Sequence, residues 1–247
     1  MKIILYFCLF LFLLLLGPLL MRWSSKINMS TDWEKANRES AGLAPNPNNT
    51  PEALVQVYGA RAFNWRGLFA VHTWIAVKPA HAQTYTVYQV LGWRHLQKAP
   101  VVVINDDIPD RYWFGSPPEI YNDIRGAEAE EIIHKIKSAS DHYPYANIYI
   151  LWPGPNSNTY VAFLGREIPE LKINLPITAI GMNYLPNNRW LVKAPSGTGF
   201  EFSIRGYAGI TFANVEGFRI NLFGFVFGIS WHKGLALLWP GIGRIGF

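Results

Sequence analysis

Cysteine is nearly absent from this sequence of 247 residues. The single thiol, Cys8, lies inside a long hydrophobic run near the N-terminus. One cysteine can form no intramolecular disulfide, and the chain beyond the run can hold neither a cysteine zinc cluster nor a cysteine nucleophile. Because such a chain suits an oxidising or a reducing compartment equally well, the thiol content leaves the compartment open.

Charged residues are also scarce. They make up 16% of the sequence against 50% hydrophobic residues, a balance that excludes an intrinsically disordered chain. The net charge of +5 depends mainly on Lys2, Arg22 and Lys26, which flank the hydrophobic run; without these three, 19 of the 22 Lys and Arg residues remain against 17 acidic residues. No basic stripe follows, so no nucleic acid is predicted as a partner.

Motifs for metals and cofactors are missing too. The six His residues include no pair at i, i+4 spacing and no HExxH motif. Residues 241–246 read GIGRIG, but a dinucleotide site needs this motif between a strand and a helix, with an acidic residue about 20 positions further on. We therefore predict no metal and no cofactor.

The hydrophobic run itself covers residues 3–21, which are 19 residues without a charge. A helix of this length spans about 28 Å, close to the hydrocarbon thickness of a bilayer. A cleaved signal peptide would have a shorter apolar core and small residues at its cleavage site, whereas Met21-Arg22-Trp23 follows directly. We predict an uncleaved transmembrane anchor over residues 1–23, in contact with the membrane through residues 3–21.

The orientation of the anchor rests on conflicting charges. Lys2 favours an N-terminus inside the cytoplasm, and Arg22 and Lys26 favour the opposite. We choose the N-terminus inside, with the domain outside the cytoplasm, because this is the usual arrangement when such a segment doubles as an export signal.

Composition divides the rest of the chain. Residues 24–50 are rich in Ser, Asn and Pro and are predicted to form a flexible tether. Residues 51–247 are predicted to form a single compact α+β domain. Strands are expected at 67–78, 84–93, 99–104 and 146–152, and helices from Thr50-Pro51 onward, in two pieces across 117–138, and at 159–168.

Short apolar stretches divided by Gly and Pro follow residue 172 and predict a second small sheet. One of them, INLFGFVFGI at 220–229, is too short to span a bilayer and forms either core or an interfacial patch. An architectural role on lipid requires this stretch to expose a contiguous apolar face.

Two groups of side chains could carry chemistry. Asp106, Asp107 and Asp110 lie together in a loop beside aromatic residues, as in sugar hydrolases, although Asp in such loops more often caps or makes turns. The stronger hypothesis pairs His72, early in a strand, with Ser157, in a sharp turn before a helix. A helix N-terminus supplies free N–H groups for an oxyanion, here around Asn158, and a strand His could act as base. Both residues also have structural interpretations, a helix cap and a hydrogen-bonded core residue.

Several segments together resemble a family of bacterial membrane-anchored proteins whose domain has no known function. The resemblance covers about residues 67–247 and implies a protein of the bacterial inner membrane with its domain facing the periplasm. The segments are HTWIAVKPA, PDRYWFGSPPEI, WPGPNSNTYVAF, LPITAIG, APSGTGF and PGIGRIG.

A second resemblance, limited to residues 67–165, is to circularly permuted NlpC/P60-type papain-like domains. In these amidases, peptidases and acyltransferases a strand His precedes a Cys that opens a helix. His72 matches the His, and residues 156–160 match the helix opening, with Ser157 in place of the Cys. The resemblance implies a papain-like antiparallel sheet with helices, to which the β-rich C-terminal part is an extension. It leaves the residue that would orient His72 open among Tyr88, Gln89 and His81.

Two functions follow from these resemblances. One is an amide or acyl hydrolase or transferase of the envelope that uses His72, Ser157 and the backbone at Asn158. The other is a catalytically inactive papain-like module that binds a cell-wall peptide, a glycan, a lipid or an envelope protein. The missing thiol keeps both open, because a hydroxyl is far less acidic than a thiol.

Overall fold

The computed structural model describes residues 2–30 and 32–246. Within them the chain forms four α-helices and two antiparallel sheets, which confirms the mixed α+β class. The α-helices are α1 (Lys2–Met21), α2 (Trp93–Leu96), α3 (Ala127–Asp141) and α4 (Ser157–Glu167). Short 3₁₀ turns are η1 (Pro47–Asn49), η2 (Asn64–Leu68), η3 (Pro169–Leu171) and η4 (Pro186–Asn188).

The first sheet has five strands in the order β4-β3-β2-β1-β5. Two of its three inner strands, β1 and β2, are rich in β-branched and aromatic residues and are buried along their whole length. Helices α3 and α4 cover one face, while the Ala44 and Trp113 segments cover the other. The strands are β1 (Leu54–Arg61), β2 (Val71–Lys78), β3 (Thr86–Val90), β4 (Val102–Asp106) and β5 (Pro118–Arg125).

The second sheet is a meander in which every strand pairs with its neighbour in sequence, in the order β12-β11-β10-β9-β8-β7-β6. It contains the strands predicted after residue 172. The strands are β6 (Leu191–Lys193), β7 (Gly199–Ile204), β8 (Ala208–Ala213), β9 (Gly217–Leu222), β10 (Phe225–Ser230), β11 (Ala236–Trp239) and β12 (Gly243–Gly246).

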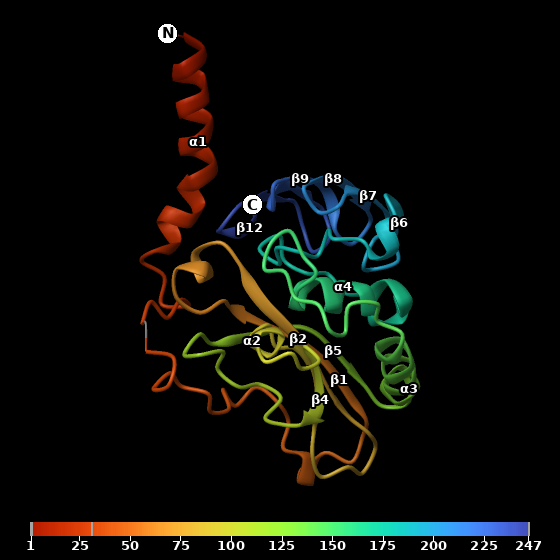
Figure 1. Cartoon of the computed structure of the whole chain (residues 1–247). Helices are drawn as coiled ribbons and strands as arrows, with labels where there is room; N and C mark the ends of the chain where they lie inside the picture. The colour runs from red at the N-terminus through yellow and green to blue at the C-terminus, as the bar shows by residue number, and fades with distance from the viewer. Residues whose placement is uncertain (1, 31, 247) are drawn as a thin grey trace.

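Helix α4 lies between the two sheets (Figure 1), and every residue from Ser157 to Gly165 is buried. It packs on β2 below, and Arg166 forms an ion pair with Glu201 of β7 above, at 2.8 Å. A side chain at Gly165 would collide with the Pro195 carbonyl oxygen, 2.7 Å from the Cβ position. Helix α4 is therefore a buried middle layer that contacts the first sheet through β2 and the second sheet through Arg166, near its C-terminus.

Helix α1 leaves the domain beside the second sheet (Figure 1). It is long and apolar enough to cross a membrane, and most of its side chains are exposed. Only Gly17 and Pro18, near its C-terminal end, are buried, against Pro240 and Gly241. A Cβ at Gly17 would lie 1.8 Å from the Pro240 carbonyl oxygen, so this contact requires glycine.

Three local predictions are wrong. The segment after Thr50-Pro51 forms strand β1 and not a helix, because its alternating apolar residues pair with both β2 and β5. Residues 118–125 form edge strand β5, where half-exposed positions resembled a helix period. Residues 146–152 form a turn, an irregular stretch and a bend beside the first sheet. The Ala146 carbonyl accepts from the Val101 backbone at 2.8 Å, but no strand ladder follows.

The predicted tether, residues 24–50, lies along the domain. Asp110 accepts hydrogen bonds from the Ser40 hydroxyl at 2.8 Å and the Ala44 backbone at 3.0 Å, and the Tyr112 backbone donates to Glu39 at 2.9 Å. These bonds place the segment over the face of the first sheet that the helices leave uncovered. Its flexibility stays a prediction.

Candidate functional site

A large cleft opens at one end of the first sheet, where the start of β2, helix α2, turn η2 and the N-terminus of α4 meet. Its volume is about 1110 Å³. Nine of its lining side chains are aromatic, none is acidic, and two are Arg. The aromatic residues are Trp33, Phe63, Trp65, Phe69, Trp93, Trp113, Phe114, Tyr149 and Trp152.

The N-terminus of α4 forms part of the cleft wall. Asn156 is its N-cap, and the side-chain oxygen accepts from the backbone of Asn158 at 2.9 Å and of Thr159 at 3.2 Å. The Thr159 hydroxyl oxygen in turn accepts from the Asn156 backbone N–H at 3.0 Å, which completes a capping box. The cap is therefore Asn156, which leaves Ser157 as the first helical residue, with its side chain on the cleft.

Asn158 fastens this helix end to the sheet. Its amide nitrogen donates to the carbonyl oxygens of Val71, at 2.9 Å, and Ile180, at 2.8 Å, and its oxygen accepts from the Thr73 hydroxyl at 2.9 Å. The side chain thus positions the cleft wall. Its backbone role as an oxyanion donor stays a prediction.

His72 lines the other side of the same cleft. It pairs with Ala60 of β1 and shares a sheet face with Trp74. The imidazole stacks on the Trp113 indole with ring centroids 3.6 Å apart and planes 9° apart. Burial lowers the pKa of His72 to about 3, so the ring is neutral at physiological pH, and its Nε2 has no hydrogen-bond partner.

His72 and Ser157 share the cleft but not a sheet face. Thr73 reaches Asn158 of α4, and successive side chains of a strand point to opposite faces, so His72 points away from α4. In the described part of the chain no hydrogen bond joins the His72 ring to the Ser157 hydroxyl. Both residues belong to the lining of the cleft, and both are largely buried there. Their catalytic roles stay a prediction.

The candidate partners of His72 lie elsewhere. Tyr88 belongs to the core under the helices, and burial raises its pKa. His81 is exposed after the far end of β2. Gln89 is buried on β3, opposite Val103. None of the three lines the cleft.

The aspartates of the 106–110 loop have structural partners. Asp107 pairs with Arg111, and Asp106 accepts from the hydroxyl of Thr84 at 2.9 Å. Asp110 is buried and accepts the bonds that hold residues 40–44. The turn-making interpretation therefore accounts for them. Within residues 2–30 and 32–246, no three His, Cys, Asp or Glu side chains are grouped as metal ligands.

The aromatic lining was not predicted from the sequence. Its members come from the tether, from η2, from α2, from the 107–117 loop and from the 146–156 bends, so no local motif joins them. The high aromatic content of 15% was the only signal, and it carried no position.

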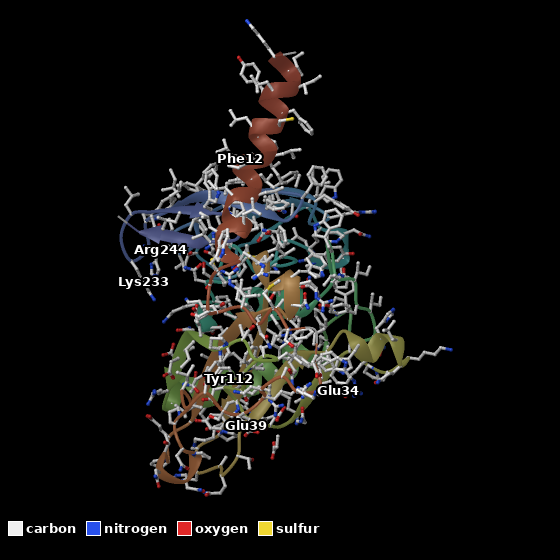
Figure 2. All side chains as sticks on the ribbon, turned by 90° about the vertical axis from the view of Figure 1, so that its left-hand side faces the viewer. Phe12, Glu34, Glu39, Tyr112, Lys233 and Arg244 are labelled. Carbon is white, nitrogen blue, oxygen red and sulfur yellow. The ribbon has the colours of Figure 1, made fainter. Side chains whose placement is uncertain are left out.

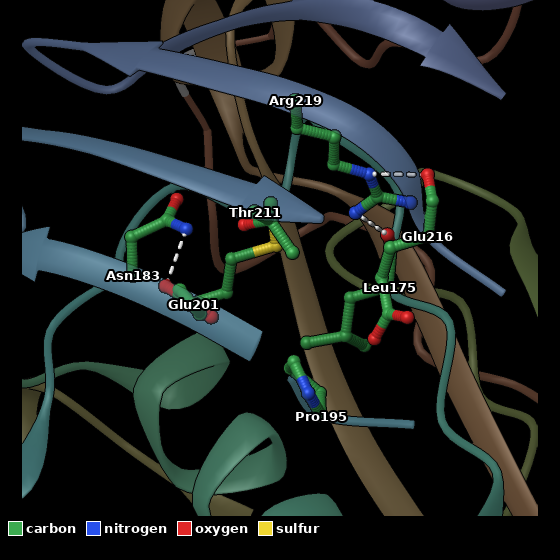
Figure 3. A pocket seen from close by; sticks show the side chains of 8 residues that line it. Leu175, Asn183, Pro195, Glu201, Thr211, Glu216 and Arg219 are labelled. Carbon is green, nitrogen blue, oxygen red and sulfur yellow. Dashed lines mark hydrogen bonds between the residues drawn. The ribbon is translucent and has the colours of Figure 1, made fainter. Parts of the chain in front are cut away.

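A second, small cavity of about 10 Å³ lies under the C-terminal sheet (Figure 3). Arg219 donates to the backbone oxygens of Glu216, at 3.0 Å, and Leu175, at 3.0 Å, and Asn183 donates to Glu201 at 2.7 Å. Burial lowers the pKa of Arg219 to about 10, and the nearby Glu216 and Glu201 oppose this shift. A space of this size holds at most about one water molecule, so it is a packing feature of the polar layer.

The fold and the cleft together define an α+β protein with one N-terminal apolar helix and an aromatic site. Residues 52–184 match the family described as Protein of unknown function (DUF3750). The match covers more than half of the chain, which therefore belongs to this family and confirms the predicted membership of a family without known function. The matched region contains the first sheet and all of the cleft lining except Trp33 and Arg38. Neither a curated protein nor a solved structure matches the chain.

Proposed function

We propose that this protein is a membrane-anchored binding module of the bacterial envelope, whose aromatic cleft takes an amphipathic ligand such as a lipid or a lipid-linked molecule. The observation that carries the proposal is the size and lining of the cleft. At about 1110 Å³ it is slightly larger than the range typical of ligand sites, about 300–1,000 Å³. Such a volume suits acyl chains better than a single small polar metabolite.

The charged side chains that line the cleft favour a ligand with an anionic head group. Arg38 and Arg66 are the charged side chains that line it, and no carboxylate opposes them. Arg38 lies over the Phe114 ring at 4.5 Å, so its guanidinium is held at the aromatic wall. An anionic group such as a phosphate fits this arrangement, because Arg binds planar or tetrahedral oxyanions with two parallel hydrogen bonds.

The position of the cleft supports a ligand drawn from the membrane. Turn η2, which supplies Trp65 to the lining, contacts α1. Phe69 packs edge-on against Phe225 of the second sheet, and Trp152 donates to the Phe223 carbonyl at 3.1 Å. The cleft therefore lies beside the helix that we propose as anchor. We further propose that the domain faces the periplasmic side of the inner membrane.

The proposed scaffold is a permuted NlpC/P60-type papain-like domain that has lost catalysis. It is supported by an N-terminal helix end with Ser157 packed on a strand that carries His72. The hydroxyl in place of a thiol, the neutral imidazole with a pKa near 3 and the opposite sheet faces of the two residues favour binding over turnover.

Lipid photocrosslinking tests this function. The full chain is reconstituted in vesicles that contain phosphatidylglycerol with a photoactivatable acyl chain, and crosslinked peptides are mapped by mass spectrometry. We expect crosslinks in the cleft lining that excess unlabelled lipid removes. Trp93→Ala should weaken them about tenfold, equivalent to about 1.4 kcal/mol, because half-exposed Trp93 lines the cleft.

Trp190→Ala is the matched control, since Trp190 is exposed and does not line the cleft. Crosslinks confined to α1, or an equal loss in both variants, would contradict a lipid-binding cleft.

Hydrolysis or acyl transfer is the second candidate, favoured by the Ser157 hydroxyl at a helix N-terminus in the cleft that His72 also lines. An activated serine reacts with fluorophosphonate probes. This candidate predicts labelling at Ser157 in the full chain and none in Ser157→Ala. An unlabelled wild-type chain at neutral pH would exclude it.

A further inference from the structure

The C-terminal sheet exposes apolar side chains and buries polar ones, the reverse of a sheet in a typical soluble domain. Along β7 the apolar residue Phe200 is 63% exposed, whereas its neighbour Glu201 is 1% exposed. On β8 Phe212 is 65% exposed and Thr211 is buried, and on β9 Arg219 is buried between two exposed apolar residues. Antiparallel sheets with one wet face normally place polar residues outside. This one buries Glu201 and Arg219 against the domain and turns its aromatic rings outside.

Strand register makes the exposed face continuous. Phe200 pairs with Phe212, Phe212 with Phe218, and Phe218 with Ile229. Residues directly opposite one another in an antiparallel pair point to the same face. A second row runs parallel to the first. We call this surface the outer face; its exposed members are Leu191, Phe200, Phe202, Ile204, Ile210, Phe212, Phe218, Ile220, Leu222 and Ile229.

The polar side of the sheet is fixed in place by its partners. Glu201 accepts from Arg166 at 2.8 Å and from Asn183 at 2.7 Å, and Arg219 donates to Asn174 Oδ1 at 2.7 Å. A one-residue slip of register would bury the aromatic rings but would break all of these bonds. The orientation of the outer face is therefore set by the buried Arg166–Glu201 ion pair and by the buried hydrogen bonds of Arg219.

The outer face lies next to the anchor helix. Gly17 and Pro18 of α1 pack against Pro240 and Gly241, in the turn between β11 and β12. In Figure 1 the sheet caps the end of the domain from which α1 rises. In Figure 2 carbon-rich side chains project from the sheet along the lower part of α1, below the labelled Phe12. A bilayer that contained α1 would therefore meet this face.

The exposed charged residues around the outer face are all basic. From residue 189 to 246 the acidic residues are Glu201 and Glu216, and both are buried. The exposed charged residues of this part of the chain are all basic: Arg189, Lys193, Arg205, Lys233 and Arg244. Basic side chains beside an apolar face favour anionic lipid surfaces by about 1 kcal/mol each.

We propose that the outer face is a second membrane-binding surface, seated in the interfacial layer of the same bilayer that α1 spans and in contact with anionic phospholipids. The proposal rests on the proposed membrane anchoring of α1, and it adds a monotopic contact that holds the domain flat on the membrane. The outer-face rings would enter the bilayer to about 5–10 Å, the depth typical of interfacial apolar faces. The aromatic cleft, joined to this sheet through Phe225 and Trp152, would then open at the lipid surface.

Lipid quenching of a fluorophore at single cysteines tests the proposal. The native thiol, Cys8, reports on α1. In a Cys8→Ser chain, Phe212→Cys reports on the outer face, and Glu131→Cys, exposed on α3, reports on a surface remote from the sheet. Each full-length protein is labelled with an environment-sensitive dye and reconstituted in phosphatidylcholine–phosphatidylglycerol vesicles. The quenchers are lipids brominated on the acyl chain.

We expect strong quenching at positions 8 and 212 and none at 131. Quenching at 8 but not at 212 would overturn the outer-face proposal and leave the anchor intact. No quenching at 8 would refute the anchor, and the outer-face proposal with it. A dye at 212 that is shielded from aqueous iodide but not quenched by lipid would assign the face to a protein partner, such as a second copy, and would also overturn the proposal.

Discussion

His72 fits a catalytic motif by residue type and position, but its surroundings make the imidazole a poor base. The imidazole stacks on the Trp113 indole and lies near Trp74, so it is a neutral aromatic ring in the lining of the cleft. A general base works best with a pKa near the operating pH. Since burial lowers the pKa of His72 to about 3, the ring is poorly matched to proton transfer near neutral pH.

The lowered pKa predicts how stability depends on pH. The unfolded chain binds a proton at His72 below about pH 6.5, while the folded chain stays neutral there until about pH 3. Stability from this group is therefore complete above pH 6.5 and falls as pH decreases through that window, by up to about 1.4 kcal/mol per pH unit.

We expect His72→Phe, which keeps the aromatic stack, to remove this dependence. Between pH 7 and 5 the free energy of unfolding of the wild type should fall about 2 kcal/mol more than that of the variant, by denaturant titration in detergent micelles. Other titrating groups cancel in the comparison. Parallel curves for the two proteins would show that His72 is not buried as a neutral ring.

At the scale of elements, helix α4 joins the first sheet to the second. Its N-terminus binds the start of β2 through Asn158, and its C-terminal turn binds β7 through Arg166 and Glu201. The Arg166–Glu201 pair has both side chains buried, and Nε and Nη1 of Arg166 have no hydrogen-bond partner. Buried pairs of this kind add little net stability but are costly to break on one side only.

Arg166→Met should therefore lower the free energy of unfolding by about 3–5 kcal/mol, because Glu201 would remain buried with a single neutral donor, Asn183. Adding Glu201→Met should recover a large part of that loss. Chemical denaturation of the three variants in micelles measures both effects. If the double variant were as unstable as the sum of the single ones, the pair would not be coupled.

At the scale of the whole molecule, the features of functional interest gather toward one end. Helix α1, the outer face of the second sheet and turn η2 beside the cleft are neighbours, and the first sheet extends away from them (Figure 1). Because these features lie at one end of the molecule, we propose a ligand from the membrane and not a cell-wall peptide. Residues 24–50 return along the far face of the first sheet and supply Trp33 and Arg38 to the cleft.

The sequence by itself determined the features that depend on local pattern. The 19-residue apolar run, helix α4 after its Asn cap, strands β2, β3 and β4, and the small C-terminal strands follow from hydrophobic period, capping and turn residues. It also named His72 and Ser157, which do line one cleft. The 118–125 and 146–152 segments were misassigned because edge strands and bends leave weak periodic signals.

Only the tertiary structure decided which way side chains point and what they meet. The two-residue period of β2 puts His72 and Thr73 on opposite faces, and a sequence cannot say which face receives α4. The same period allowed two arrangements of the C-terminal strands, one that buries the Phe side chains and one that buries Glu201 and Arg219. The buried partners of Glu201 and Arg219 come from distant segments, so folding alone selected the arrangement that turns the aromatic rings outward.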